Sequence, residues 1–206
     1  MRISKILSQR HLSFQRPIML VANHNYSANR LKFALMMGIL IMSTTSHAAP
    51  VTIENNEKWI LVNDSVMGGV SSSQVSFANN IGTFSGELSL ERNGGFASTR
   101  TQVAQAIDIK ARVISMTVKG DGRQYQLRVR TDDNWDAIAY SQVFDTEKDA
   151  WQTFNFTADQ FSAVYRGRKV KAPALALIDV KQIGFLLADK QPGRFSLSFK
   201  ELQFRP

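Results

Sequence analysis

Hydrophobic and polar residues alternate in short runs from residue 51 to the end of the chain, and Gly, Asn and Asp separate the runs. Such alternation is typical of strands, because successive side chains of a strand point to opposite faces. The runs recur about every ten residues, a spacing that favours a sandwich or barrel over alternating strands and helices. We expect strands at residues 59–63, 73–78, 82–90, 95–101, 112–119, 124–131, 137–144, 151–157, 182–188 and 194–204.

The run at residues 124–131 shows the alternation most clearly. Tyr125, Leu127 and Val129 fall on one face of the expected strand and should lie in the core. The opposite face is polar and carries Gln124, Gln126, Arg128 and Arg130. One hydrophobic face and one polar face predict a strand of an antiparallel sheet that has solvent on one side.

Three short segments have the composition of turns. Gly120-Asp121-Gly122 stands between two expected strands and predicts a tight hairpin, because glycine permits the positive φ that such a turn requires. Asn79-Asn80 predicts a second hairpin. Residues 158–162 predict one helical turn with Thr157 as its N-cap, and residues 161–181 form the longest stretch without an expected strand. The sequence therefore predicts one all-β domain at 49–206 with little helix.

The positive charge of the chain is concentrated at its N-terminal end. The formal net charge is +8, yet no acidic residue precedes Glu54. The basic residues of that segment are Arg2, Lys5, Arg10, Arg16, Arg30 and Lys32. The rest of the chain holds 19 basic and 17 acidic residues and is nearly neutral. A nucleic-acid partner is therefore not expected, since binding to phosphates needs a broad basic surface on the folded part.

Residues 1–48 have the order of a basic leader with a signal peptide. Arg30 and Lys32 precede an apolar run at 33–42, and small residues follow up to Ala48, after which we expect cleavage. The run is shorter than the roughly 20 apolar residues of a membrane-spanning helix, so no stable span is expected. Translation from Met19 would give a signal peptide of more usual length. The prediction is export to the periplasm or beyond; a mitochondrial transit peptide and an uncleaved anchor are the alternatives.

The residues of the expected domain exclude several kinds of catalytic site. The chain contains no cysteine, and its three histidines, His11, His24 and His47, all lie in the leader. A Ser-His-Asp triad, a thiolate nucleophile and the usual zinc sites are thereby excluded from residues 49–206. We therefore expect a protein that is not an enzyme and that needs no cofactor and no metal.

Two acidic groupings leave alternatives open. Asp64, Glu87 and Glu91 are candidates for the carboxylate pair of a glycoside hydrolase, although spacing along the chain does not pair them. The acidic segment at 132–136 offers oxygen atoms to calcium, but it lacks the glycine and the distal glutamate of an EF-hand loop. Solvated acids in the first case and a polar turn in the second are the favoured interpretations.

Three loops are rich in glycine, asparagine and charged residues. They lie at 63–71, at 93–98, which leads into Arg100, and at 165–168. Turn chemistry alone explains such a composition, but loops also carry binding sites. Arginine offers a planar set of donors for carboxylates, amides or sugar hydroxyls. The candidate residues for binding a ligand or partner are Asp64, Arg100, Arg123, Arg128, Arg166 and Arg168.

The same segments carry a resemblance to a known family. The motifs are Asn63-Asp64-Ser65-Val66-Met67-Gly68-Gly69-Val70-Ser71, Asn93-Gly94-Gly95-Phe96-Ala97-Ser98, Gly120-Asp121-Gly122-Arg123-x-Tyr125, Arg128-x-Arg130, Trp151, Phe161, Arg166-Gly167-Arg168, Ile183-Gly184-Phe185 and Asp189-Lys190-Gln191. In this order, from Trp59 to Leu202, they resemble the complex I intermediate-associated protein 30 family. The resemblance implies a galactose-binding-like jelly-roll β-sandwich. It also implies a non-catalytic, chaperone-like role in protein assembly, which mitochondrial members perform for respiratory complex I.

Two hypotheses on function follow. The first is an exported binding module that holds a protein partner or an assembly intermediate. Because the expected export signal separates this chain from the mitochondrial matrix, the complex I role itself is not expected to transfer. The second is a carbohydrate-binding, lectin-like module that uses the polar face of the sandwich. The residues expected to form that face are Gln124, Gln126, Arg128, Arg130, Tyr140 and Gln142. A hydrolase built on carboxylates is a third and weaker possibility.

Overall fold

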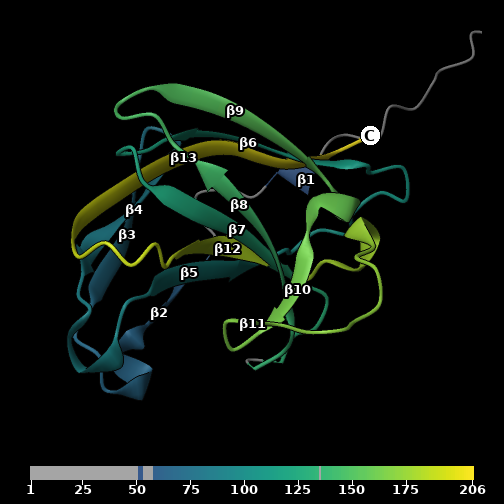
Figure 1. Ribbon diagram of the computed structural model, residues 1–206. Helices are drawn as coiled ribbons and strands as arrows, with labels where there is room; N and C mark the ends of the chain where they lie inside the picture. The colour runs from purple at the N-terminus through teal and green to yellow at the C-terminus, as the bar shows by residue number, and fades with distance from the viewer. Residues whose placement is uncertain (1–50, 53–57, 135) are drawn as a thin grey trace, which may run out of the picture. The chain divides into compact units, whose positions relative to one another are not determined.

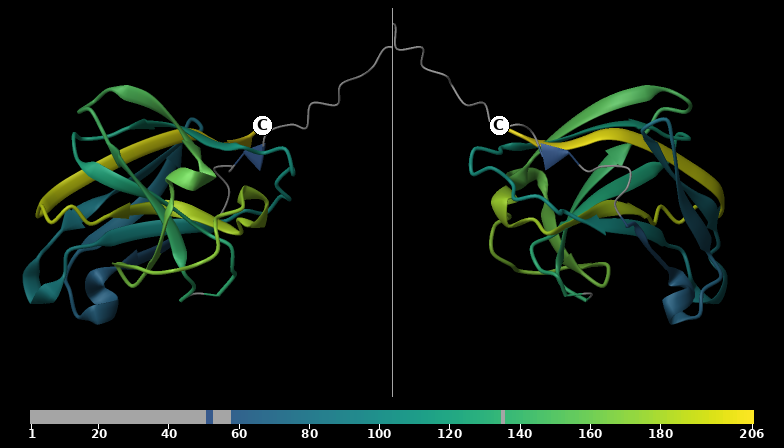
Figure 2. Two further views of the ribbon diagram at one scale, coloured as in Figure 1. Left: turned by 45° about the vertical axis from the view of Figure 1, so that its right-hand side comes forward. Right: turned by 180° about the vertical axis from the view of Figure 1, so that it is seen from behind.

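A computed structural model describes residues 51–52, 58–134 and 136–206. They fold into a sandwich of two antiparallel sheets (Figure 1). All of them lie within one compact unit, Ser46–Pro206. The predicted leader and its cleavage site lie outside the described residues. Figure 2 shows the two layers from two further directions.

The first sheet has six strands in the order β3-β4-β13-β6-β9, with β1 paired to β13. Its strands are β1 (Val51–Thr52), β3 (Ser72–Ala78), β4 (Ile81–Leu88), β6 (Val113–Lys119), β9 (Trp151–Thr157) and β13 (Gly193–Arg205). The long strand β13 pairs with both β4 and β6 and so forms the centre of this layer. Its alternate side chains, among them Phe195, Leu197 and Phe199, are buried against the other sheet.

The second sheet has seven strands in the order β11-β10-β8-β7-β12-β5-β2. Its strands are β2 (Ile60–Asn63), β5 (Ala97–Gln102), β7 (Gln124–Arg130), β8 (Ala139–Asp145), β10 (Ser162–Tyr165), β11 (Arg168–Lys169) and β12 (Gln182–Leu187). Short 3-10 helices join the strands: η1 (Asp64–Met67), η2 (Glu91–Asn93), η3 (Ala158–Gln160) and η4 (Leu177–Asp179). No longer helix occurs in the described part, as the strand rhythm predicted.

The core lies between the two sheets and explains the alternation seen in β7. Tyr125, Leu127 and Val129 are fully buried there. Aromatic rings from both layers meet beside them: the ring centroids of Phe185 in β12 and Phe199 in β13 lie 5.0 Å apart. With no cysteine in the chain, burial of apolar surface between the sheets holds the layers together. The outer face of β7 is left to Gln124, Gln126, Arg128 and Arg130.

All ten expected strands are present, with ends that differ by up to two residues. The Asn79-Asn80 hairpin joins β3 to β4, and both residues have positive φ, as a type I′ turn requires. The hairpin predicted at Gly120-Asp121-Gly122 is wrong, because β6 and β7 belong to different sheets. This turn instead carries the chain from one layer to the other, a difference that turn composition does not reveal.

The region 161–181 also differs from the expectation of a long loop. It contains the short hairpin β10–β11, which adds two strands to the edge of the second sheet beside β8. The helical turn before it is confirmed as η3, where the N–H of Thr157 donates to Oε1 of Gln160 over 2.8 Å. Strands of four and two residues are too short to show an alternation pattern, and they are therefore not predictable from it. No helix in the described residues is long and apolar enough to cross a bilayer.

Candidate ligand-binding pocket

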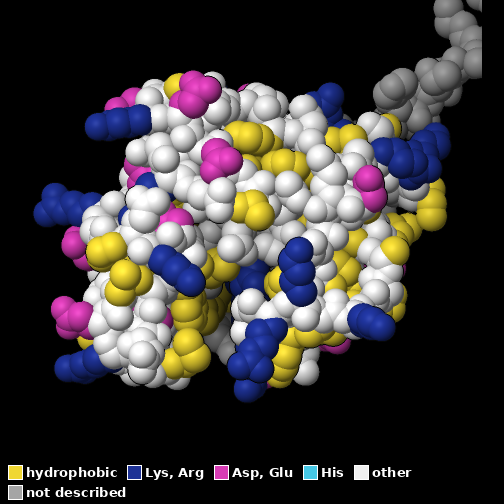
Figure 3. Space-filling view, viewed as in Figure 1, with side chains coloured by type: hydrophobic (Ala, Val, Ile, Leu, Met, Phe, Trp, Pro, Cys, Tyr) yellow, Lys and Arg dark blue, Asp and Glu magenta, His cyan; other side chains and the backbone are white. Residues whose placement is uncertain are grey.

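A pocket of about 610 Å³ lies on the outer face of the seven-stranded sheet. It opens in the lower half of Figure 3, between hydrophobic side chains on either side. Strand pairing builds its floor. Gly184 in β12 lies directly opposite Arg100 in β5 and Arg128 in β7, and residues paired in this way share one face of a sheet. Arg130 follows two residues after Arg128 and therefore points the same way.

Gly184 is the reason that there is room above this row. A Cβ atom at this position would collide with the carbonyl oxygen of Thr99 and with Arg100. Glycine thus lets the backbones of β5 and β12 approach closely and leaves the centre of the row without a side chain. The result is a gap between Arg100 and Arg128 instead of a continuous layer of side chains.

The arginines of the floor are held in an unfavourable electrostatic environment. Burial lowers the pKa of Arg100, and burial together with the charge of Arg100 lowers the pKa of Arg128. Burial and the charges of Arg100 and Arg128 lower the pKa of Arg130 to about 10, although Asp136 opposes the shift. All three remain protonated at neutral pH. The floor of the pocket is therefore positively charged.

Hydrogen bonding at the floor is incomplete within the described residues. Among the described residues, only three buried side-chain nitrogen or oxygen atoms lack a hydrogen-bond partner. They are the indole Nε1 of Trp59 and the Nε atoms of Arg128 and Arg130. Two of the three are thus at the pocket floor. None of the salt bridges in the described structure includes Arg128 or Arg130. Buried donors of this kind normally have partners, so these two can serve an acceptor from outside the chain.

The walls of the pocket are mostly apolar. On one side, η1 contributes Val66 and Met67, whose exposed fractions are 65% and 67%. Phe96 and Leu186 also line the pocket. On the other side stands the β10–β11 hairpin with the half-exposed ring of Tyr165. Large exposed apolar side chains around a charged floor are typical of an interaction site.

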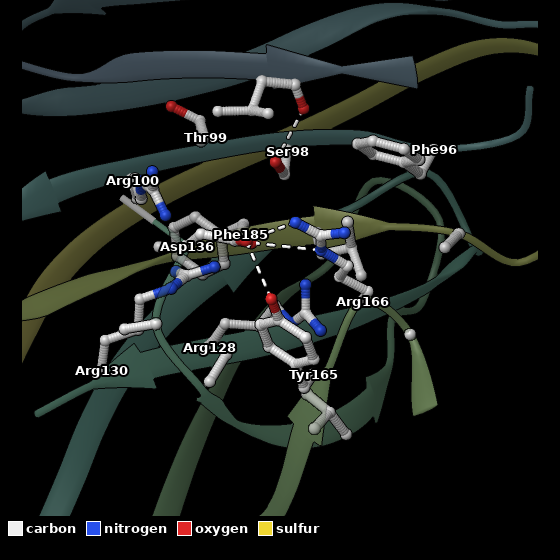
Figure 4. Close-up of a pocket in the computed structure, with 18 of the residues that line it drawn as sticks. Phe96, Ser98, Thr99, Arg100, Arg128, Arg130, Asp136, Tyr165, Arg166 and Phe185 are labelled. Carbon is white, nitrogen blue, oxygen red and sulfur yellow. Dashed lines mark hydrogen bonds and ion pairs between the residues drawn. The ribbon is translucent and has the colours of Figure 1, made fainter. Parts of the chain in front are cut away.

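Asp136 ties the hairpin wall to the loop before β8 (Figure 4). Its carboxylate accepts hydrogen bonds from the hydroxyl of Tyr165, at 2.9 Å, and from Arg166. These bonds, that of Arg166 first, lower the pKa of Asp136. Both charged side chains are largely exposed, so the pair sits at the rim. Asp136 is the only acidic residue among those that line the pocket in the described structure.

Asp64 lies outside the pocket and is fully buried. Its carboxylate accepts hydrogen bonds from N–H and Oγ of Ser71, at 2.9 and 2.5 Å, and from N–H of Gly95 at 2.7 Å. Burial alone would raise the pKa of Asp64, but these bonds outweigh it and lower the pKa. A Cβ atom at Gly69 or Gly94 would collide with this carboxylate. The two glycine-rich loops are thus explained by close packing around one buried acid.

Arg123 is likewise part of the scaffold. It forms a two-point ion pair with Asp189, through Nε at 2.8 Å and Nη2 at 2.7 Å. Its remaining donors reach the carbonyl oxygens of Gln191, Gly193 and Arg194. The guanidinium therefore fastens the turn before β13 to the start of β7, and it does not line the pocket. The hydrogen bond with Asp189 raises the pKa of Arg123.

The structure brings three of the six predicted site residues together at the pocket: Arg100, Arg128 and Arg166. Asp64 and Arg123 hold loops, and the exposed Arg168 in β11 does not line the pocket. The predicted site list missed Asp136 and the apolar walls, and Arg130 was named only for the possible carbohydrate-binding face. Placing Tyr140 and Gln142 on that face is wrong, because they lie opposite Val129 and Leu127 and so point to the inner side of the sheet. Arg130 was visible in the alternation of β7, where it shares a face with Arg128. The walls were not, because strand order across the sheet decides which loops meet.

The same pattern of motifs and fold appears in known proteins. The model of the family Complex I intermediate-associated protein 30 (CIA30) matches residues 49–199, most of the chain. The chain belongs to the CIA30 family. This confirms the resemblance drawn from the motifs. No curated protein sequence matches the chain.

Solved structures place the CIA30 fold of this chain among jelly rolls. A family 11 carbohydrate-binding module of the cellulosomal cellulase Lic26A-Cel5E of Clostridium thermocellum is 14% identical, with a TM-score of 0.55 over 76% of this chain and 94% of the module. The Clostridium thermocellum module in complex with a beta-1,3-1,4-mixed-linked tetrasaccharide is 13% identical, with a TM-score of 0.53 over 76% of this chain and 98% of that one. At these identities the likeness establishes the fold: a jelly-roll β-sandwich, as predicted.

No metal centre is formed by the described residues: they contain no group of three or more His, Cys, Asp or Glu side chains placed to hold an ion. The acidic segment that begins at Asp132 has the bonding of a turn. Oδ1 of Asp132 accepts from N–H of Asn134 at 2.7 Å, and Asp133 pairs with Lys181 over 3.0 Å. The polar-turn interpretation of this segment therefore fits its hydrogen bonds.

Proposed function

We propose that this chain is a non-catalytic binding module that holds a protein partner in the pocket on the outer face of the seven-stranded sheet. The observation that carries the proposal is the combination of a basic floor with exposed apolar walls. Membership of a family named for association with a complex I intermediate supports a partner that is a protein. The proposed setting is outside the cytoplasm, on the strength of the signal-peptide pattern at 1–48.

The chemistry of the pocket supports binding without catalysis. General acid–base or carboxylate chemistry needs at least one acid or base that is free to exchange a proton with a ligand. The one carboxylate in the described pocket lining, Asp136, is engaged with Tyr165 and Arg166, which favour its ionised form. Residues 49–206 contain neither histidine nor cysteine. Arginine binds and orients charged groups but does not exchange protons at neutral pH.

The walls favour a peptide over a neutral sugar. Val66 and Met67 are flexible or branched aliphatic side chains that fit the side chains of a protein segment. Sugar-binding faces rely on planar aromatic rings, and the described pocket lining contains three aromatic residues, Phe96, Tyr165 and the buried Phe185. The half-exposed ring of Tyr165 and the carbohydrate-binding modules among the structural relatives keep a carbohydrate ligand as the second candidate.

The pocket can be tested by blocking one wall. Met67→Glu places a carboxylate beside the arginine floor, where it competes with a ligand. Ile109→Glu is the matched control, since Ile109 is also a large apolar side chain with 70% exposure but does not line the pocket. The wild-type chain and both variants are used in cross-linking capture from a native envelope fraction and on a glycan array.

We expect the wild type and Ile109→Glu to capture the same protein, and Met67→Glu to lose it while keeping its melting temperature. Glycan binding that depends on Met67, without protein capture, would move the conclusion to the second candidate. Capture by all three proteins would show that the partner binds elsewhere and would overturn the proposal.

A further inference from the structure

The floor of the pocket offers hydrogen-bond donors that nothing in the described structure accepts. Arg128 and Arg130 are two residues apart on β7, so their side chains extend from the same face of the sheet. Their Cα atoms are about 7 Å apart. Nε of each is buried without a partner. Arginine has no acceptor atoms, so the two side chains do not satisfy each other. The group that completes this site must therefore be an acceptor, and the positive charge of both guanidinium groups favours an anion.

The surroundings indicate how much negative charge the ligand carries. Residues beyond the leader are close to electrical neutrality, with 19 basic and 17 acidic residues. At the rim, the carboxylate of Asp136 already faces Arg166. A polyanion needs a broad basic surface, and the one arginine at this rim is already paired. A single anionic group that enters the pocket and leaves the rim untouched fits better.

The apolar walls indicate what surrounds that anion. Val66, Met67 and Leu186 cannot form hydrogen bonds, and they line the space above the arginines. A ligand that filled the pocket with hydroxyl groups would leave many of them without partners, at a cost in free energy. A carboxylate flanked by aliphatic side chains satisfies both the floor and the walls. Carboxylates also match the planar fork of arginine, which can bind them through two parallel bonds.

We infer that Arg128 and Arg130 bind the carboxylate of an Asp or Glu side chain in an acidic, otherwise apolar segment of the protein partner. This inference rests on the proposed function and adds the chemical class of the bound segment. Gly184 has a specific part in it, because the missing side chain in the middle of the row leaves the room in which the carboxylate reaches the floor.

The inference is tested with two matched peptide arrays and the full chain. One array displays acetylated nonapeptides with a central Glu between varied aliphatic residues, and the other displays the same peptides with Gln. The proteins are the wild type, Arg128→Gln, Arg130→Gln and, as control, Arg194→Gln, which removes an exposed arginine outside the pocket. Circular dichroism and thermal melts of each variant establish that it is folded. The digalacturonate anion is added as a competitor that carries carboxylates on a sugar.

We expect the wild type and Arg194→Gln to bind a subset of the Glu peptides and to bind their Gln counterparts at least tenfold more weakly. Arg128→Gln and Arg130→Gln should each lose that discrimination while they remain folded. Because a ligand that binds only the folded state raises the melting temperature, a bound Glu peptide should also raise it in the wild type and not in these two variants.

Equal binding of Glu and Gln peptides, or discrimination that survives in Arg128→Gln and Arg130→Gln, would overturn the inference. Binding of digalacturonate but of none of the Glu peptides would also overturn it, in favour of an acidic glycan. The proposed function fails separately. If capture of the native partner depends on Met67 but not on Arg128 or Arg130, the pocket binds a protein through its walls and only the carboxylate inference is wrong.

Discussion

Strand β7 has an arginine just before its first residue and two more near its other end. The two groups differ in whether the chain supplies hydrogen-bond acceptors for them. Arg123 uses its donors on Asp189 and on three backbone carbonyls. Arg128 and Arg130, a few residues later, have buried Nε atoms without partners in the described structure. Both groups are partly buried, so the difference lies in the acceptors that the fold supplies.

Arg123 is thus an arginine that holds the fold, whereas Arg128 and Arg130 are placed to serve a ligand. A buried charge costs free energy unless paired and hydrogen-bonded, and Arg123 meets this condition inside the chain. Arg128 and Arg130 meet it only when another molecule supplies the anion. The free domain is thus less stable than one with satisfied residues at these two positions, a trade-off between stability and function known from functional sites.

The largest effect is expected from Arg123→Met. The side chains of Arg123 and Asp189 are 10% and 4% exposed, so the substitution leaves a buried carboxylate without its partner. Removing one member of a buried pair costs about 3–5 kcal/mol. Urea unfolding followed by tryptophan fluorescence should show that loss. A loss below about 1 kcal/mol would mean that this ion pair does not hold the end of β7. Arg123 would then not differ from the pocket arginines in its contribution to stability.

A smaller loss is expected from Asp64→Asn. The amide accepts fewer of the bonds from Ser71 and Gly95, and charge-assisted hydrogen bonds contribute about 1.5–3 kcal/mol. Because the folded-state pKa of Asp64 is lowered, its contribution is fully present above the ordinary pKa of about 3.8 and is lost as the pH falls through the folded-state value. Urea unfolding between pH 2 and 7 should therefore show a shallower acid decline for Asp64→Asn than for the wild type. Equal slopes would contradict this assignment.

These scaffold residues also show how far the sequence leads. The alternation of β7 predicted its buried and exposed faces, and the spacing of the strands predicted the sandwich. Asp64 lies in a glycine-rich loop and Arg123 follows an expected hairpin turn, positions that are typical of binding residues. In the structure these segments instead pack around a buried acid and an ion pair. Which of the charged residues find partners within the chain depends on strand order, and the sequence does not contain that order in any local pattern.

The smallest effect is expected from Arg166→Ala. Its ion pair with Asp136 is exposed, and exposed pairs add little to stability. The melting temperature should stay within about 2 °C of the wild type. Capture of the partner should weaken, since the hairpin wall of the pocket keeps only one of its two side chains that bond to Asp136, that of Tyr165. A large drop in melting temperature would show that the rim is part of the scaffold instead.

The most direct test of the central claim is a pair of melts with the same substitution at the two ends of β7, Arg123→Met and Arg130→Met, each without ligand. Methionine keeps most of the aliphatic length of arginine and removes the charge. If the pocket arginines are reserved for a ligand, Arg123→Met melts well below the wild type, whereas Arg130→Met melts at the same temperature or higher. An Arg130→Met variant that melts as low as Arg123→Met would contradict the account, because both arginines would then hold the fold.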